Sequence, residues 1–412
     1  MLKWQAIFTL LLKTRTLVWV YILLALIVTF QNISLGSFEF KMPAQAPSGQ
    51  NIVNNLDTMK KYVGYSFTNY NNYVIFKRSW VHLTKGKNLY IIYPAEHWDL
   101  FKYSPTFAFL FAPLALMPDF IGLAIWNLLN SLVLFLAIRQ LPFSDKNRNL
   151  FLAFVLIEQL TAIQNEQSNT LMAGLMLLAY ISLQKGKAQW ATLWLVVATL
   201  IKIFSVIGFC LFLFYPKKLK FIGYAILWSL LFFMLPLLVT PWHTLLWQYQ
   251  NWATVLAADQ STSYGLSVMG WLHSWFGIEG GKNIVTLIGM ALFLLPLIKW
   301  RLYKNELYRL LILASMLLWV VIFNHKAESP TFVIALTGVG VWYFSRDAVW
   351  WRTLLLWLVF IFTSLSVTDL FPHSIKDNFF IPYTVKVLPC IFVWCVVVVE
   401  LMLMKPVALK RI

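Results

Sequence analysis

Charged side chains are scarce in this sequence. Asp, Glu, Lys and Arg make up 12% of the 412 residues, and hydrophobic residues make up 60%. Soluble domains carry about a quarter charged residues. The mean hydropathy is +0.71, and apolar runs recur along the whole chain. This excludes a soluble domain with a single anchor and indicates a polytopic membrane protein. No polar stretch is long enough for a separate soluble domain, so we expect one membrane domain over residues 1–412.

The apolar runs also lack the alternation that a membrane barrel requires. In lipid, backbone groups must be hydrogen-bonded within the protein, which leaves helix bundles or closed barrels. Barrel strands alternate in hydropathy over about 10 residues, whereas these runs are continuous. We therefore expect an all-α bundle.

Acidic residues and cysteines are few as well. The chain has 33 Lys and Arg against 16 Asp and Glu, a net charge of +17. The basic residues lie between apolar runs, where they would contact anionic lipid headgroups, so we expect no nucleic-acid partner. Cys210, Cys390 and Cys395 all lie inside apolar runs. We therefore expect no disulfide in an exported loop.

The first apolar run, residues 16–30, follows Lys3, Lys13 and Arg15. A signal peptide has a similar composition. However, QNISLG follows the run, without a small-x-small cleavage motif. We favour an uncleaved first helix with a cytoplasmic N-terminus.

Clusters of Lys and Arg predict the topology, because cytoplasmic loops carry an excess of both. Between neighbouring clusters the chain must cross outward and return, which predicts about twelve crossings, a multi-pass protein of the plasma (inner) membrane and two cytoplasmic termini. Residues 105–138 should cross once, with bends at Pro113 and Pro118. The clusters are Lys13/Arg15, Arg139/Lys146/Arg148, Lys185/Lys187, Lys217/Lys218/Lys220, Lys299/Arg301/Lys304/Arg309, Arg346/Arg352 and Lys405/Lys410/Arg411.

Two segments between basic clusters contain a polar interruption. Residues 150–184 are interrupted at 164–169 (QNEQSN), and residues 189–215 at Lys202. Each reads as a helical hairpin whose arms are about 20 Å long, shorter than the hydrocarbon core of about 30 Å. Such turns are tolerated where they line a protein cavity, so we expect both in one pocket open to the exported side. The alternative for 189–215 is a single helix with Lys202 in its middle.

Two long loops are predicted on the exported side, residues 31–104 and about 241–282. In the first, Tyr73, Phe76, Trp80 and Leu83 follow helical spacing, and Gly86 would end that helix. This predicts an amphipathic helix at the membrane surface. The second loop is rich in Trp, which usually marks the membrane interface.

Polar and charged residues that we predict on the exported side form four clusters. Carboxylates could accept a proton from an attacking hydroxyl, and cations could stabilise a departing phosphate, which suits transfer from a phosphate-bearing lipid. Each cluster also has a plainer interpretation as a solvated turn, a wet loop or a local ion pair. Glu158, in mid-span, could pair with Lys202 and be structural. The clusters are Glu96/His97/Asp99/Lys102/Tyr103, Gln164/Glu166/Asn169, Lys202 and His325/Lys326/Glu328.

No metal-ligand spacing, nucleotide-binding loop or nucleophile elbow occurs in the sequence. We therefore predict no cofactor and no metal site, and the sequence does not decide whether a metal ion is needed.

Several stretches, in order along most of the chain, resemble glycosyltransferase family 87, membrane enzymes of the GT-C class that use polyprenyl-phosphate sugars. The most specific is KYSPTFAFLFAPLALMP at 102–118. The others are WNLLN (126–130), QNEQSN (164–169), LIK (200–202), DQS (259–261) and ESPTF (328–332).

The resemblance implies a helix bundle with a hydrophilic cavity on the exported face. It also implies an acidic base at the start of the amphipathic helix in the first exported loop, where this chain has Asn72. An amide cannot act as that base, and Asn72 would instead cap the helix. Ile203 replaces the Pro that often follows the lysine in the family. The remaining site residues are Asp99, Glu166 and Glu328 as candidate bases, His325 near the reaction centre, Lys202 and Lys326 on the phosphate, and Tyr103, Gln164 and Asn169 lining the cavity.

These expectations together describe an inverting membrane hexosyltransferase. It would move a hexose, for which mannose is our choice, from a polyprenyl phosphate to a lipid-linked or glycan acceptor on the exported face. Two alternatives stay open, a lipid or solute transporter (a flippase) and a non-catalytic binder of lipid-linked sugar. The sequence does not decide the sugar, the acceptor or the oligomeric state.

Overall fold

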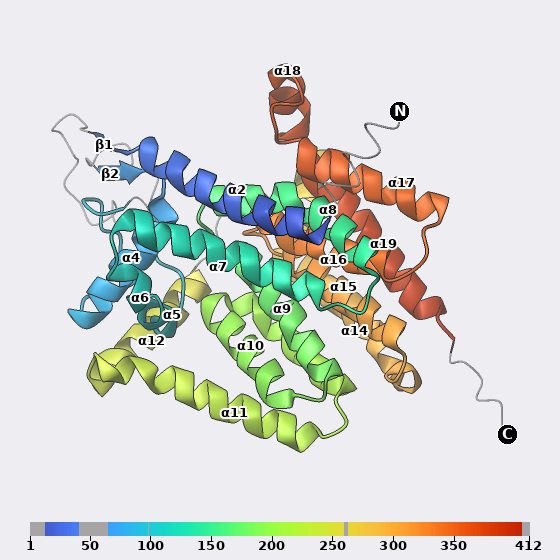
Figure 1. The fold of residues 1–412 in the computed structure, drawn as a ribbon, viewed down its shortest axis with the longest axis horizontal. Helices are drawn as coiled ribbons and strands as arrows, with labels where there is room; N and C mark the ends of the chain where they lie inside the picture. The colour runs from blue at the N-terminus through green and yellow to red at the C-terminus, as the bar shows by residue number, and fades with distance from the viewer. Residues whose placement is uncertain (1–12, 41–64, 98, 259–262, 406–412) are drawn as a thin grey trace.

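The computed structural model describes residues 13–40, 65–97, 99–258 and 263–405 (Figure 1). Lys3, Lys410, Arg411 and the DQS stretch at 259–261, all used above, lie outside them. In chain order the elements, where η marks 3-10 and π turns, are α2 (Thr14–Ser34), β1 (Ser37–Phe40), β2 (Tyr65–Thr68), α4 (Asn71–Thr84), α5 (Pro105–Leu110), α6 (Ala112–Ala115), α7 (Asp119–Arg139), α8 (Asp145–Gln164), α9 (Asn169–Gln184), α10 (Ala188–Ile201), η2 (Ile203–Phe214), α11 (Lys218–Met234), η3 (Leu235–Leu238), α12 (Trp242–Ala258), α13 (Val268–Phe276), α14 (Lys282–Leu294), η4 (Leu295–Ile298), η5 (Trp300–Leu302), α15 (Glu306–Ile322), η6 (Ser329–Thr331), α16 (Phe332–Phe344), α17 (Trp350–Val359), η7 (Phe360–Leu365), α18 (His373–Ile375), η8 (Lys376–Phe380), η9 (Val385–Val387) and α19 (Leu388–Leu403).

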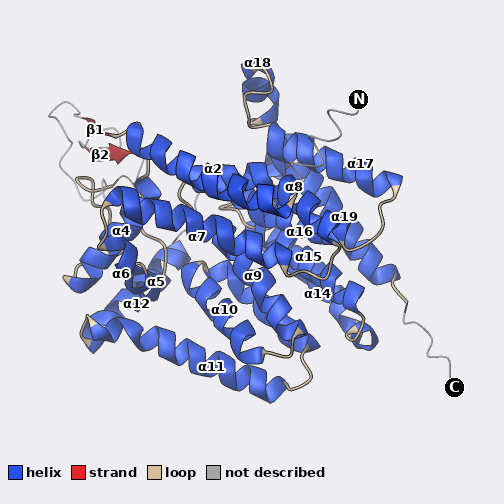
Figure 2. Ribbon diagram, viewed as in Figure 1, coloured by secondary structure: helices blue, strands red, loops and turns tan. Residues whose placement is uncertain are grey.

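Helices dominate the described chain, as the composition predicts (Figure 2). The exception is a short antiparallel pair in the first long loop, in which Ser37 of β1 lies opposite Thr68 of β2. The hydropathy pattern did not predict this pair. Its strands have four residues each, too few to produce a periodic signal.

Four helical stretches are long and apolar enough to cross a membrane: 14–35, 119–139, 218–238 and 385–403. The other apolar helices among the described residues are shorter, so the total of about twelve crossings stays a prediction. The distribution of buried and exposed apolar residues nevertheless fits a helix bundle surrounded by lipid. Helices α15 and α16 are buried along most of their length. On α11, by contrast, Ile226 is 55% exposed and Leu230 54%, as expected of a face that contacts acyl chains.

Both predicted hairpins are present. Helix α8 ends at Gln164 and α9 begins at Asn169, and Lys185 at the far end of α9 donates a 2.9 Å hydrogen bond to Gln140, near the start of α8. In the second hairpin, Tyr215 Oη donates to the backbone oxygen of Gly186 at 3.1 Å. The chain therefore reverses at Lys202, and the single-helix alternative for 189–215 is wrong.

Residues 105–138 do not form the single bent helix that we expected. They divide into α5, α6 and α7. Pro113 lies in the first turn of α6, and Pro118 is the N-cap residue of α7. Proline lacks a backbone N–H, which costs nothing in a first helical turn but is unfavourable inside a helix. Each proline therefore starts a new helix, and only α7 is long enough to cross.

Several basic clusters meet at one end of the bundle, which we call the basic end. Arg139 contacts Asp145 at 2.9 Å, and Lys185 contacts Gln140 at 2.9 Å. Asn147, beside Arg148, donates to the backbone oxygen of Phe344 at 3.2 Å. The clustering agrees with the topology argument, while the assignment of this end to the cytoplasm stays a prediction.

The two long loops that we assigned to the exported side contact each other through α12, at the lower left of Figure 1. Gln248 of α12 accepts the backbone N–H of Leu89 at 3.1 Å and donates to the backbone oxygen of Lys87 at 2.6 Å. Trp252 donates from its indole N–H to the backbone oxygen of Lys102 at 3.1 Å. One tryptophan of the second loop therefore connects the two loops instead of only marking an interface.

Candidate active site

Four side chains from three segments form a continuous chain of hydrogen bonds. Lys202 donates from Nζ to Oδ1 of Asn169 at 2.7 Å, and Asn169 donates from Nδ2 to Oε1 of Gln167 at 2.6 Å. Gln167 in turn donates from Nε2 to Oε2 of Glu328 at 3.0 Å. We call these residues the polar relay. They bring together three of the four clusters singled out in the sequence.

Backbone geometry explains the position of Lys202. The residue has an extended conformation (φ −134°, ψ 115°) between α10 and η2, so its side chain leaves the helix axis at the break. The adjacent turn of α10 is held from outside, because Ser104 donates from Oγ to the backbone oxygen of Leu200 at 2.5 Å. Ser104 also caps α5.

The fourth cluster reaches the relay through Tyr103. Its ring centroid lies 5.9 Å from Nζ of Lys202, a distance at which an aromatic face attracts a cation. The backbone of Tyr103 is held in place by Tyr90, which donates from Oη to the backbone oxygen of Tyr103 at 2.9 Å. Tyr103 therefore lies against the ammonium, and its role as a cavity-lining residue stays a prediction.

The turn between α8 and α9 has a specific conformation. Glu166 has a φ of +48°, which is uncommon for a residue with a side chain. Its backbone oxygen accepts the indole N–H of Trp126 at 2.7 Å. Asn130, also on α7, accepts the backbone N–H of Leu171 at 3.1 Å. The WNLLN stretch of α7 therefore holds the turn, a role that the sequence analysis did not assign.

The Glu166 side chain points away from the relay. It is 2% exposed, accepts a hydrogen bond from Nδ2 of Asn32 on α2, and accepts another from the backbone N–H of Asn72 at the start of α4. Gln164 is exposed, and its backbone oxygen accepts Asn32 Nδ2 at 3.2 Å. Of the three candidate carboxylates, Glu166 thus serves as a buried anchor between two helices.

Asn72 does not cap α4, contrary to our expectation. The helix begins at Asn71 with Tyr70 as the N-cap residue, so Asn72 lies inside the first turn, where its side chain cannot reach the backbone N–H groups that a cap serves. It donates instead from Nδ2 to the backbone oxygen of Asn165 at 2.8 Å. The amphipathic helix itself is confirmed: Tyr73 and Phe76 are fully buried, and Gly86 follows with a φ of +63°.

The cluster at 96–103 divides into two parts. Glu96 turns toward α4, where its Oε2 lies 2.9 Å from His82 Nε2 and 3.6 Å from Arg78 Nε. His97 is buried beside this pair, and burial lowers the pKa of its imidazole to about 4, against a weaker opposing effect of a hydrogen bond with Asp99. Asp99 itself acts electrostatically on Tyr103. Asp99, Tyr103 and Lys102, which acts electrostatically on Lys202, therefore lie near the relay, whereas Glu96 and His97 do not.

The segment that carries Glu328 packs against the second long loop. Leu266 donates its backbone N–H to the backbone oxygen of Ala327 at 2.8 Å. Gly265, with a φ of +58°, lies so close that a Cβ atom there would be 2.5 Å from the backbone oxygen of His325. Glu328 then begins η6 in a reciprocal cap with Thr331. His325 and Lys326 are thereby held next to Glu328, and their catalytic roles stay predictions.

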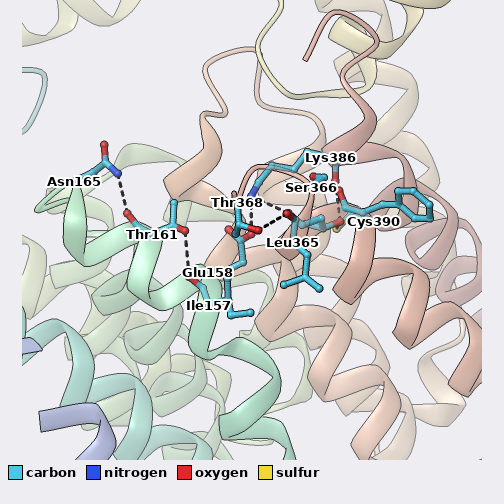
Figure 3. Close-up of polar contacts among 11 residues, drawn as sticks. Ile157, Glu158, Thr161, Asn165, Leu365, Ser366, Thr368, Lys386 and Cys390 are labelled. Carbon is cyan, nitrogen blue, oxygen red and sulfur yellow. Dashed lines mark hydrogen bonds and ion pairs between the residues drawn. The ribbon is translucent and has the colours of Figure 1, made fainter. Parts of the chain in front are cut away.

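A pair between Glu158 and Lys202 was considered from the sequence, but the structure does not contain it. The Glu158 carboxylate accepts Nζ of Lys386 at 2.6 Å, and both side chains are almost fully buried (Figure 3). Lys386 also donates to the backbone oxygen of Thr363 at 2.9 Å. Lys202 and Glu158 both lie in apolar sequence, so sequence alone could not exclude their pairing. The better signal was Lys386, a second lysine inside an apolar run.

Within the described residues, no group of three or more His, Cys, Asp or Glu side chains is arranged to hold a metal ion. The relay, by contrast, offers one cation, two amides and one carboxylate. Such a set can hold a phosphate at one end and accept a proton at the other.

The comparison with known families agrees with this arrangement. The model of glycosyltransferase family 87 matches residues 101–324, a range that includes Tyr103, Gln167, Asn169 and Lys202 and ends shortly before Glu328. No curated protein gives a significant match. Since the family match covers more than half of the 412 residues, the chain belongs to glycosyltransferase family 87.

Proposed function

We propose that this membrane glycosyltransferase moves a hexose, mannose in our assignment, from a polyprenyl phosphate to a lipid-linked or glycan acceptor on the exported face. The observation that carries the proposal is the polar relay from Lys202 to Glu328. The relay connects the cation and the carboxylate through two amides instead of a direct ion pair. A site that must receive a sugar between an acid-base group and a phosphate needs this separation.

Lys202 is the proposed ligand of the donor phosphate. Its ammonium is held in place by Asn169 and faces the Tyr103 ring, so it is oriented before substrate arrives. A fixed cation of this kind stabilises negative charge that develops on a leaving group. Lys326, in the segment that also carries Glu328, is the second candidate for the same phosphate.

Glu328 is the best-placed base of the three carboxylates. It is exposed and bonded to Gln167, whereas Glu166 is buried against other groups. Asp99 is the second choice. In the proposed step the carboxylate takes the proton of the acceptor hydroxyl, and the acceptor oxygen bonds to the anomeric carbon. The bond from that carbon to the phosphate oxygen breaks, and its electron pair leaves with the polyprenyl phosphate, so the configuration inverts.

The test is transfer of radiolabel from polyprenyl-phosphate mannose by the purified protein, reconstituted with membrane lipids and glycans as acceptors. We expect label in a product with wild-type protein, and a loss of about 10²- to 10³-fold in rate with Lys202→Met. Lys187→Met removes an exposed lysine at the basic end and is the matched control. A folded wild-type protein that transfers no label to any acceptor would overturn the proposal.

Asn72 gives the non-catalytic alternative some support, because it occupies the position of the family base and anchors a turn instead. The same reconstituted protein separates the two readings. A binder would retain the labelled lipid without forming product, and its retention would be unaffected by Glu328→Gln.

A further inference from the structure

A cavity of about 400 Å³ lies at the basic end, at the other end of α9 from the polar relay. Asn169 begins α9, and Leu183 and Gln184 near its end line the cavity. At 1.5 Å per residue the two sites are roughly 20 Å apart. The cavity is therefore separate from the proposed transfer site.

Three segments close around this cavity. They are the end of α9 with Gly186, the end of η2 with Tyr215, and Arg309 in the first turns of α15. Tyr215 joins two of them through its hydrogen bond to Gly186. The rings of Phe214 and Tyr303, 5.0 Å apart, join η2 to the segment before α15. The walls are thus fixed by contacts between the segments, and the cavity is within the usual size range of ligand sites, about 300–1,000 Å³.

The lining carries positive charge and no carboxylate. Lys217 and Arg309 both line it, from different elements. Glu306, one turn before Arg309, is close enough to act electrostatically on Tyr180 but is not among the lining residues. A cavity with two cations and no acidic side chain favours an anionic ligand.

Two buried polar atoms in the lining lack a well-formed hydrogen bond. Tyr180 is 1% exposed, and neither its Oη nor the Nε of Arg309 makes a hydrogen bond of good geometry among the described residues, although the two side chains lie close enough to act on each other. Leaving buried groups without well-formed hydrogen bonds is unfavourable, so the presence of both in one cavity indicates a ligand that satisfies them. Arg309 presents several N–H groups in a planar fork, which matches the oxygens of a phosphate.

We propose that this cavity binds a phosphate group, held by Arg309 and Lys217 with Tyr180 as a further hydrogen-bond donor. Leu211 and Phe214 supply an apolar wall, and Leu219, two residues after Lys217, is 85% exposed. An amphipathic ligand could therefore extend from the cavity along α11. The phosphate can come from the headgroup of an anionic phospholipid or from a soluble phosphate, and the experiment distinguishes these sources.

The test measures binding, so it does not depend on the proposed transfer activity. Thermal unfolding of the purified protein in detergent is followed with increasing dioctanoyl phosphatidylglycerol, inorganic phosphate or dioctanoylglycerol, which lacks the phosphate. We expect a rise in melting temperature with one or both phosphate compounds and none with dioctanoylglycerol. A response to phosphatidylglycerol alone identifies a lipid site, and a response to inorganic phosphate identifies a soluble one.

Arg309→Gln should weaken the response about tenfold or more in ligand concentration, since it removes a charge-assisted hydrogen bond. Lys220→Gln, the same change at an exposed lysine outside the lining, is the control and should respond as wild type. Tyr180→Phe keeps the ring and should still weaken binding about fivefold, so it decides the question if Arg309→Gln does not fold. The proposal is overturned if no phosphate compound shifts the melting temperature, or if Arg309→Gln and Tyr180→Phe both respond like Lys220→Gln.

Discussion

Lys202 and Asn169 are 33 positions apart in sequence, yet the lysine ammonium donates a 2.7 Å hydrogen bond to the asparagine side chain. Each residue lies at the point where a helical hairpin turns. The contact therefore joins the two interrupted segments at their turns, and it places the cation next to Gln167 and Glu328 without pairing it to a carboxylate.

The first prediction concerns the base. Glu328→Gln keeps the shape of the side chain but removes its ability to accept a proton, so the turnover number should fall about 10²- to 10⁴-fold. Glu279→Gln, at an exposed position in the second long loop, should leave it unchanged. Turnover is measured by release of labelled product. If Glu328→Gln keeps full activity and Asp99→Asn instead shows the loss expected of Glu328→Gln, Asp99 is the base.

The second prediction concerns Asn169, which connects Lys202 to Gln167. Asn169→Ala removes a hydrogen bond to a charged group, worth about 1.5–3 kcal/mol, so kcat/KM should fall about 10- to 100-fold. Because Lys202 itself is still present, Asn169→Asp, which can again accept from the ammonium, should recover part of the loss. Initial rates at several donor concentrations check this. Equal kcat/KM values for wild type and Asn169→Ala would show that the relay does not orient the lysine.

A third prediction uses Gly265. Gly265→Ala introduces a Cβ atom 2.5 Å from the backbone oxygen of His325, which must displace the segment that carries Glu328 and reduce transfer at least about tenfold. Gly277 has a similar φ of +65° with no atom within 4 Å of an added Cβ. Gly277→Ala thus carries the same backbone strain without the collision, and its activity should match wild type. Similar losses in both variants would mean that strain alone explains the effect.

The buried ion pair allows a fourth prediction. Glu158→Ala leaves the Lys386 ammonium buried without its carboxylate partner, which should destabilise the protein by about 3–5 kcal/mol. The double variant Glu158→Leu with Lys386→Met removes both charges, and it should recover most of this loss. Unfolding in mixed micelles measures both. A double variant as unstable as the sum of the two single variants would indicate that the pair is not coupled.

The fifth prediction concerns pH. His97 titrates with a pKa of about 4 in the folded protein, below the usual imidazole value of about 6.5. Between these values the unfolded chain binds more protons than the folded one, so stability is complete above about pH 6.5 and falls as the pH drops toward 4. The loss should reach a few kcal/mol at most, ~3.

The measurement is the melting temperature at a series of pH values. His97→Gln should flatten the pH dependence of the melting temperature between about pH 6.5 and 4, whatever the substitution does to the melting temperature at neutral pH. His373, which is exposed, provides the control His373→Gln with an unchanged slope. An unchanged slope in His97→Gln would contradict the assignment.

Much of the architecture could be read from the amino acids in order. Continuous apolar runs predict helices, because lipid cannot hydrogen-bond a free backbone. The polar residues 164–169 and the single Lys202 predicted the two reversals, since charge is costly in mid-helix there. The aromatic spacing from Tyr73 to Leu83 predicted α4. These are local signals, and each depends on residues within a few turns of one another.

The pairing of polar side chains could not be predicted in this way, because the paired side chains meet only after the helices pack. Sequence alone could not decide between Lys202 and Lys386 as the partner of Glu158, for both lysines lie in apolar surroundings. It placed Asn72 at a helix end, but the helix starts one residue earlier and the side chain serves the 164–169 turn instead. The three candidate carboxylates were equivalent in sequence and differ sharply in burial. The sequence by itself determined that the chain is helical and where its two hairpins turn, through local hydropathy. Only the tertiary structure decided which polar groups share a site, because desolvation and hydrogen-bond geometry are set by packing.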